Sequence, residues 1–330
     1  DVRMPESPQR DLQERLDGIR PRLDAVRRQV HHVVIGLDPL IDGMLSALVC
    51  GGHVLLEGVP GLAKTLCATT LAGALAVDFG RVQFTPDLLP GDLLGVEVYS
   101  PQTGEFFVRR GPIFVNLLLA DEINRAPAKV QSALLEAMQE HQVTLAGRTL
   151  PLPDPFMVVA TENPVEQEGT YPLPEAQVDR FLLKLKVPYP EREAEREIVE
   201  RMATSRPPSS ARAVLEKSDI AEARAVADRI YVDARARNYA VDLVRATRET
   251  GSDLRSLVAW GASPRAAVHL VMVARARALM AGRAHVLPDD VQAAAPDVLR
   301  HRLILTFEAE AEGVRPDEVI GRVLETVPVP

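Results

Sequence analysis

The sequence predicts an α/β fold, in which helices cover both faces of a parallel sheet, followed by a helical domain. Between residues 33 and 190, short runs that are apolar throughout alternate with helical patterns, and strands that are apolar on both faces suit a parallel sheet between helices. After residue 190 the strand-like runs disappear, and segments rich in Arg, Glu and Ala dominate. We therefore expect an N-terminal helical segment over 1–30, an α/β domain over 31–190 and an all-helical domain over 191–330.

The N-terminal segment has the pattern of an amphipathic helix. Apolar residues recur at steps of three and four from Leu12 to Val30, which places them on one helix face. We expect an interruption near Gly18 and Pro21, because proline removes a backbone donor inside a helix. In the α/β domain we expect a helix from residue 64 to about 77 and strands within 53–56, 82–84, 117–119, 157–160 and 182–185.

Two segments inside the α/β domain have the pattern of hairpins. One lies near 95–110, where strand-like runs flank a turn-rich loop, and the other near 142–152, where such runs flank Ala146-Gly147. Each pattern fits an insert that projects from the domain, and each also fits an ordinary extension of the sheet.

Composition restricts the classes of function. The 330 residues are 46% hydrophobic with a net charge of −8, so we expect a soluble, folded chain without the positive field that attracts nucleic acid. The two cysteines are too few for a disulfide framework, and no apolar run approaches the roughly 20 residues that span a bilayer. A cytoplasmic location is therefore expected. The chain begins with Asp1 and not with Met, so we expect an N-terminal piece to be missing or processed.

The stretch GVPGLAKT has the pattern of a phosphate-binding loop between a predicted strand and a predicted helix. In such a loop the backbone N–H groups face the phosphates, Lys64 reaches the β and γ phosphates, and the Thr65 hydroxyl holds Mg²⁺. The usual pattern has glycine at Ala63; at a helix start we expect a right-handed backbone there, which tolerates a methyl group. The alternative is a glycine-rich turn without a ligand. The candidate nucleotide-binding residues of the loop are Gly58, Val59, Pro60, Gly61, Leu62, Ala63, Lys64 and Thr65.

The run LLLADE, residues 117–122, is an apolar strand that ends in two acids. Ligands bind at the carboxyl ends of parallel strands. Asp121 is therefore a candidate metal ligand, and Glu122 is a candidate for orienting the water that attacks a phosphate. Two acids at a strand end also occur by chance, and the loop upstream favours the functional interpretation.

These motifs resemble those of the AAA+ ATPases and, within them, those of the MoxR family. The chain carries GVPGLAKT, then LLLADEINRA (117–126), ATENP (160–164), LPEAQVDRF (173–181) and GASPRA (261–266), in the family's order. Alanine before the lysine is itself common in MoxR-type loops, so Ala63 supports the resemblance. The match spans roughly residues 30–305. It implies a nucleotide-binding domain followed by a helical lid domain, which together bind and hydrolyse ATP with Mg²⁺.

The resemblance assigns three further residues, each of which also fits a simpler role. Asn163 stands in the place of the polar residue called sensor 1, although asparagine before a proline also favours a turn. Arg180 stands in the place of the arginine finger that reaches a neighbour's nucleotide, although it also fits a surface ion pair with Asp179. Arg265 matches sensor 2, although it also fits an exposed arginine at a helix start.

The candidate catalytic residues are Lys64, Glu122, Asn163, Arg180 and Arg265, and the candidate metal ligands are Thr65 and Asp121. Ile35 and Gly36 match the segment whose backbone meets adenine in the family, although the following Leu37-Asp38 departs from the expected form.

The resemblance also implies partners. An arginine finger requires a neighbouring subunit, so we expect a ring, with six copies as the expected number. The ring would remodel or activate a protein client, or help to insert a cofactor, and such clients can bear a von Willebrand factor A domain. The two hairpins resemble the helix-2 insert and the pre-sensor-1 hairpin, which touch the client in this clade. Tyr99, Phe106 and Phe107 are then candidate contacts, or simply the hairpin's own packing face.

Three alternatives remain at this point. The chain also fits the ATPase subunit of a magnesium chelatase, which shares the insert pattern, or a nucleotide-gated assembly module with little hydrolysis. A nucleic-acid motor is disfavoured by the net charge. The seven histidines show no zinc-type spacing, so we expect no metal beyond Mg²⁺.

Overall fold

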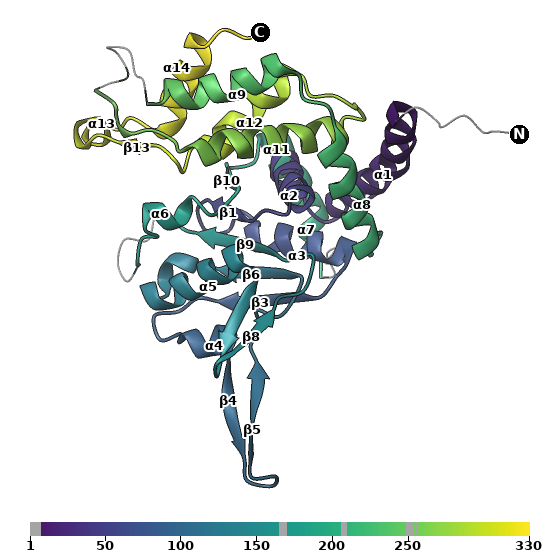
Figure 1. Cartoon of the computed structure of the whole chain (residues 1–330), viewed down its shortest axis with the longest axis vertical. Coiled ribbons are helices and arrows are strands. Elements are labelled where there is room, and N and C mark those ends of the chain that lie inside the picture. Colours follow the sequence, from purple (N-terminus) through teal and green to yellow (C-terminus); the bar gives the residue numbers. More distant parts are fainter. Residues whose placement is uncertain (1–7, 165–169, 206–209, 249–253, 255) are drawn as a thin grey trace, which may run out of the picture. The chain divides into compact units, whose positions relative to one another are not determined.

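The computed structural model describes residues 8–164, 170–205, 210–248, 254 and 256–330. The chain divides into two compact units (Figure 1), one formed by Ala25–Lys217 and the other by Asp1–Asp24 with Ser218–Pro330.

The first unit extends past residue 190, where we placed the end of the α/β domain. Strand β11 (Leu215–Glu216) belongs to this unit. It pairs in parallel with β2 (Leu75–Ala76), and Lys217 forms an ion pair with Asp78 at 3.2 Å. These contacts hold the segment after residue 190 against the α/β unit.

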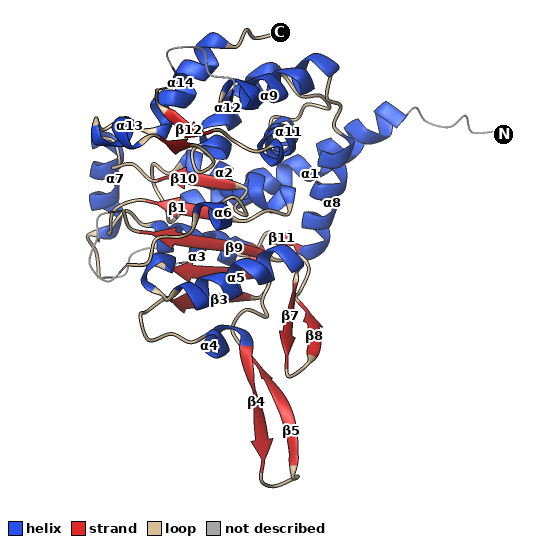
Figure 2. Cartoon of the chain, turned by 60° about the vertical axis from the view of Figure 1, so that its left-hand side comes forward, coloured by secondary structure: helices blue, strands red, loops and turns tan. Residues whose placement is uncertain are grey.

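The first unit is built around a five-stranded sheet with the strand order β10-β1-β9-β6-β3 (Figure 2). The strands are β1 (Val54–Glu57), β3 (Phe79–Gln83), β6 (Leu117–Asp121), β9 (Met157–Glu162) and β10 (Leu183–Lys186). Every neighbouring pair is parallel, which confirms the predicted sheet. All carboxyl ends therefore lie at the same edge.

Helices cover both faces of this sheet. They are α2 (Asp38–Cys50), α3 (Lys64–Ala74), α4 (Pro90–Leu94), the 3-10 turn η1 (Ile123–Arg125), α5 (Ala128–Glu140), α6 (Glu175–Val178) and α7 (Arg192–Met202). Leu118 and Ala120 of β6 pack in one apolar cluster with α5. Side chains alternate along a strand, so Leu117 and Leu119 point to the opposite face, where they are equally buried. The apolar runs in the sequence therefore reflect burial on both sides.

Two antiparallel hairpins extend from the sheet of this unit (Figure 2). They are formed by β4 (Gly95–Ser100) with β5 (Glu105–Arg110) and by β7 (Gln142–Leu145) with β8 (Arg148–Pro151). On the first hairpin, Tyr99, Phe106 and Phe107 are 51%, 63% and 50% exposed. The rings of Tyr99 and Phe106 also pack on each other, with centroids 5.1 Å apart. The aromatic residues are thus packed locally and still face solvent.

The base of the β4–β5 hairpin is a crossing of two glycines. Gly95 has a φ of 110°, and a Cβ atom added to it would lie 2.4 Å from the carbonyl oxygen of Arg109. A Cβ atom on Gly111 would lie 2.2 Å from the carbonyl oxygen of Leu93. Neither distance is compatible with a side chain, so the two chain segments pass each other backbone to backbone.

The N-terminal helix α1 (Pro8–His31) runs without a break through Gly18 and Pro21. Our expectation of an interruption there was wrong. A proline inside a helix costs about 3 kcal/mol, but the apolar stripe of α1 is buried, with Leu16 and Leu23 at 0% and 1% exposure. Burying each such side chain contributes about 1.5–3 kcal/mol, so packing outweighs the local penalty.

The second unit is helical, as predicted, with a short antiparallel ladder that the sequence did not predict. It begins with the first part of α1 and resumes at the start of α8. Its further elements are α8 (Lys217–Arg229), α9 (Ala234–Ala246), β12 (Val258–Trp260), α11 (Pro264–Met280), α12 (Pro288–Leu299), β13 (Ile304–Leu305), α13 (Phe307–Ala311) and α14 (Pro316–Thr326). Strands β12 and β13 form the ladder. Among the described helices of the chain, none is long and apolar enough to cross a membrane.

Candidate functional site

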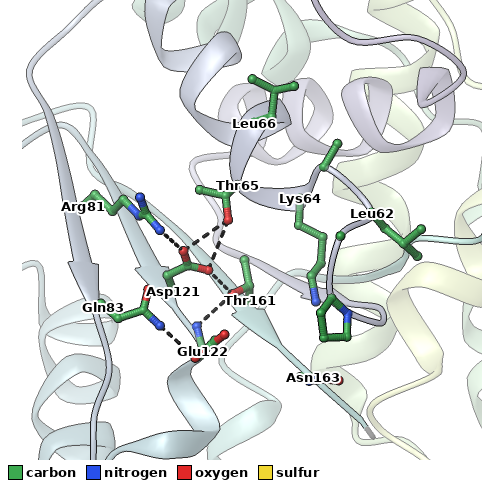
Figure 3. Close-up of a pocket in the computed structure, with 13 residues that line it drawn as sticks. Leu62, Lys64, Thr65, Leu66, Arg81, Gln83, Asp121, Glu122, Thr161 and Asn163 are labelled. Carbon is green, nitrogen blue, oxygen red and sulfur yellow. Dashed lines mark hydrogen bonds and ion pairs between the residues drawn. The ribbon is translucent and has the colours of Figure 1, made fainter. Parts of the chain in front are cut away.

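A pocket of about 430 Å³ lies at the carboxyl edge of the sheet in the first unit (Figure 3). The loop after β1, the strand ends of β6 and β9, and the edge strand β3 all contribute to it. Its lining residues are Pro60, Gly61, Leu62, Ala63, Lys64, Thr65, Leu66, Arg81, Gln83, Asp121, Glu122, Thr161 and Asn163. The fold thus brings the predicted phosphate-binding loop and the two predicted acids to one place.

The loop turns through two residues with positive φ. Gly61 has a φ of 86°, and Ala63 has a φ of 54° with a ψ of 21°. Our expectation of a right-handed backbone at Ala63 was wrong, because this residue lies in the left-handed region and caps the start of α3. A left-handed alanine costs roughly 1–2 kcal/mol, because its Cβ approaches the following carbonyl oxygen. The chain therefore adopts at Ala63 a conformation that favours glycine, with alanine in its place.

We predict that Ala63→Gly raises the free energy of unfolding by about 0.5–1 kcal/mol. Glycine removes the left-handed strain but loses about 0.5–1 kcal/mol through greater freedom of the unfolded chain. Urea denaturation measures the change. Ala146, in the turn of the second hairpin with a φ of 48°, gives the matched control, since Ala146→Gly should gain a similar amount outside the pocket. A loss of stability at Ala63 alone would contradict this account, and ADP affinity should change less than about twofold.

The Lys64 ammonium is directed toward the ends of β1 and β9. Its Nζ donates to the carbonyl oxygen of Gly58 and, at 2.9 Å, to that of Glu162. Burial lowers the pKa of Lys64 below its ordinary value, and the carboxylates of Asp121 and Glu162 oppose this effect. The carbonyl contacts hold the ammonium at the pocket wall, where an anionic ligand can reach it.

Asp121 accepts hydrogen bonds from three elements (Figure 3). The Thr65 hydroxyl lies 3.1 Å from Oδ2, the Thr161 hydroxyl lies 2.7 Å from Oδ1, and Arg81 Nη2 lies 2.7 Å from Oδ2. A carboxylate and a hydroxyl this close are hard oxygen donors of the kind that Mg²⁺ prefers. Mg²⁺ usually keeps several waters and binds one or two protein oxygens together with substrate phosphates. A donor pair of one carboxylate and one hydroxyl fits this habit.

Glu122 is held in an unusual backbone conformation next to Asp121. It has a φ of 56° and a ψ of 52°, at the start of η1. Its N–H donates to the Thr161 hydroxyl at 2.8 Å, so Thr161 ties the two acids together. Its Oε2 accepts from Gln83 at 2.8 Å and from Arg125 at 2.9 Å. The carboxylate is thereby fixed at the pocket rather than left to rotate.

Of the remaining candidate residues, one lines the pocket and four do not. Asn163 lines the pocket just after β9 and is 4% exposed. The structure does not place Ile35, Gly36 or Arg180 in the lining: the first two precede α2, and Arg180 is half-buried in the turn after α6. Arg265 belongs to the other unit, where it is exposed in the first turn of α11 behind its N-cap, Ser263.

Four contact residues of the two acids were missed from the sequence. Arg81 and Gln83 project from the same face of the edge strand β3, while Thr161 is the penultimate residue of β9 and Arg125 ends η1. A signal for the first two was available: polar residues flank Val82 with the period of two that places them on one face. The strand order needed to put that face beside Asp121 and Glu122 could not be obtained from the strand itself.

Comparison with known proteins agrees with this geometry. The family model described as "ATPase family associated with various cellular activities (AAA)" matches residues 53–183, and that of the AAA lid domain matches residues 252–323. The chain is 50% identical over 306 residues to chaperone MoxR1 of Mycobacterium tuberculosis, covering 92% of this chain and 81% of that protein. It is 33% identical over 324 residues to protein MoxR of Methylorubrum extorquens, covering 92% and 94% respectively.

A solved structure gives the same result in three dimensions. The crystal structure of a proposed ATPase from Cytophaga hutchinsonii superimposes with a TM-score of 0.90 and 45% sequence identity, covering 98% of this chain and 100% of that one. The parallel sheet and the matches to the AAA and AAA lid families define an AAA+ protein. Within that class, the chain belongs to the MoxR family of AAA+ ATPases.

Proposed function

We propose that this chain binds ATP together with Mg²⁺ and hydrolyses it to ADP and phosphate, with the α/β domain as the nucleotide-binding domain and the helical domain as its lid. The observation that supports this most strongly is that Lys64 and Thr65 line one pocket with Asp121 and Glu122. The loop supplies backbone donors and a cation for the phosphates, and the acids supply groups for a metal and a water.

Each residue has a defined task in this proposal. Thr65 and Asp121 hold Mg²⁺, which neutralises charge on the phosphates. Lys64 binds the β and γ phosphates, and Glu122 accepts a proton from the attacking water. Asn163, buried at the pocket edge, orients that water by hydrogen bonding. Ile35 and Gly36 are proposed to meet the adenine, and Arg265 is proposed to reach the γ phosphate from the lid.

We also propose that the active form is a ring of copies, with six as the expected number. Arg180 does not line the pocket of its own chain, which suits a residue that acts on the nucleotide of a neighbour. A guanidinium supplied in this way stabilises the charge that develops during phosphoryl transfer and contributes about 10³–10⁵-fold to the rate. The proposed work of the ring is chaperone-like remodelling or activation of a protein client in the cytoplasm, or cofactor insertion, with a von Willebrand factor A domain as a candidate feature of the client.

The test of this proposal is Arg180→Ala. We expect ATP binding to change little, while hydrolysis falls at least about 10³-fold. Mixing this variant with Lys64→Ala should restore part of the activity, because a mixed interface joins an intact loop to an intact arginine. The matched control is Arg196→Ala, which removes an exposed arginine paired with Glu200 and should leave the rate unchanged. Hydrolysis by dilute monomers at an undiminished specific rate would refute the shared site.

A further inference from the structure

The cation beside Asp121 is an arginine from the edge strand β3. Arg81 Nη2 lies 2.7 Å from Asp121 Oδ2, and the two side chains are 50% and 9% exposed. Figure 3 shows Arg81 and Thr65 approaching the same carboxylate from different elements. The half-exposed guanidinium of Arg81 therefore contacts the buried carboxylate of Asp121 on the neighbouring strand.

Asp121 needs a cation in this conformation. A buried carboxylate is stable only when it is paired or fully hydrogen-bonded. The two hydroxyls of Thr65 and Thr161 donate to it but carry no charge. Lys64, the other cation that lines the pocket, donates instead to the carbonyl oxygens of Gly58 and Glu162. Arg81 is thus the lining cation in direct contact with Asp121, on a carboxylate that is also a candidate ligand for Mg²⁺.

We propose that Arg81 is an exchangeable counterion, which holds the Asp121 carboxylate while no Mg²⁺ is bound and releases it when Mg²⁺ enters with a nucleotide. The inference rests on the proposed function to the extent that the pocket takes a nucleotide with Mg²⁺. A divalent ion and a guanidinium repel each other at this distance, so the two cannot share Oδ2 without cost. Because half of the Arg81 side chain faces solvent, it can move outward and keep its charge hydrated.

The exchange has opposite consequences with and without Mg²⁺. Without the metal, Arg81 shields the nucleotide phosphates from the negative charge of Asp121 and therefore favours nucleotide binding. With the metal present, Arg81 competes for the carboxylate and therefore opposes binding. Arg81 should accordingly weaken the thermodynamic coupling between Mg²⁺ and nucleotide, which is measured by the ratio of the nucleotide Kd in chelator to that in Mg²⁺.

The experiment measures ADP binding by titration calorimetry, once in EDTA and once in excess Mg²⁺, so that hydrolysis plays no part. For Arg81→Ala we expect the Kd ratio to rise about tenfold, within the usual range of such couplings, through weaker binding in EDTA and tighter binding in Mg²⁺. Arg81→Lys, which keeps the charge, should retain most of the wild-type ratio. Lys217→Ala removes an exposed cation paired with Asp78 at the other end of β3 and should leave the ratio unchanged.

An unchanged Kd ratio would overturn the inference. If both affinities fell equally, Arg81 would be a phosphate ligand, and if neither changed, Arg81 would have no role in nucleotide binding. Thermal melting of each variant shows that it is folded, and Arg81→Gln serves if Arg81→Ala does not fold. The proposed function fails separately, if the wild-type chain binds no ADP or binds it equally with and without Mg²⁺.

Discussion

Glu122→Gln is expected to bind ATP with nearly wild-type affinity and to hydrolyse it about 10²–10⁴-fold more slowly. Glutamine has the size of glutamate but cannot accept the proton of the attacking water. Both described contacts of the carboxylate, from Gln83 and Arg125, fall on Oε2. Phosphate release measures turnover, and equilibrium binding of ATP to the variant measures affinity.

Lys64→Ala is the contrasting variant. It removes the ammonium that we propose binds the phosphates, so we expect the loss of ATP affinity itself. The pair separates a defect in chemistry from a defect in binding. Turnover of Glu122→Gln at the wild-type rate would remove Glu122 from its proposed role, whatever the behaviour of Lys64→Ala.

Lys184→Met is expected to lower the free energy of unfolding by about 3 kcal/mol at neutral pH. Lys184 Nζ, from β10, lies 2.5 Å from a carboxylate oxygen of Glu57 and 2.8 Å from one of Glu162, the last residues of the adjacent strands β1 and β9. Breaking a buried ion pair by removing one partner typically costs about 3–5 kcal/mol, because the remaining charge is left unpaired. Here two carboxylates would remain. Lys186→Met, an exposed lysine of the same strand, is the matched control and should cost less than about 1 kcal/mol.

The loss should shrink as the pH falls. In the wild type, burial opposes the ionisation of Glu57, but the contacts with Lys184 outweigh burial, so the pKa of Glu57 is lowered. Ionised Glu57 therefore stabilises the folded wild type above the unfolded pKa, and this stabilisation is lost as the pH falls through the folded pKa. Burial raises the pKa of Glu162 even beside the lysine. Without the lysine, both carboxylates should have pKa values above those in the unfolded chain. The variant then takes up protons on folding, so its free energy of unfolding should be greater below the unfolded pKa than at neutral pH.

Urea unfolding at neutral pH and near the ordinary glutamate pKa, about 4.3, measures this difference. A pH-independent gap between Lys184→Met and the wild type would contradict the explanation by unpaired carboxylates. So would equal losses for the variants at Lys184 and Lys186.

The sheet and the two acids could be predicted because the responsible signals are local. A strand that is buried on both faces, such as β6, is apolar up to its last residue, and its first polar residue marks the edge where ligands bind. Ala63 was misjudged because its left-handed backbone is imposed by the loop as a whole, against the preference of alanine. Pro21 was misjudged for the same reason in α1, where burial of the apolar stripe overrides a local rule.

The counterions of the site could not be predicted, because they depend on strand order. Arg81 and Gln83 lie on a strand that is adjacent in space to β6 but separated from it along the chain by α4 and the first hairpin. Neighbours of this kind can be identified only when the strand order and register are known; in the structure, Gln83 lies opposite Asp121.

The glycine crossing at the base of the β4–β5 hairpin tolerates substitution far less than the rest of the hairpin. The arms end in exposed side chains, which can change without disturbing any core. Gly95 and Gly111 admit no Cβ atom, so both positions at the base require glycine whatever the side chains of β4 and β5. Substitutions at the exposed tip should therefore be tolerated, whereas any side chain at Gly95 or Gly111 should displace the backbone at the base of the hairpin.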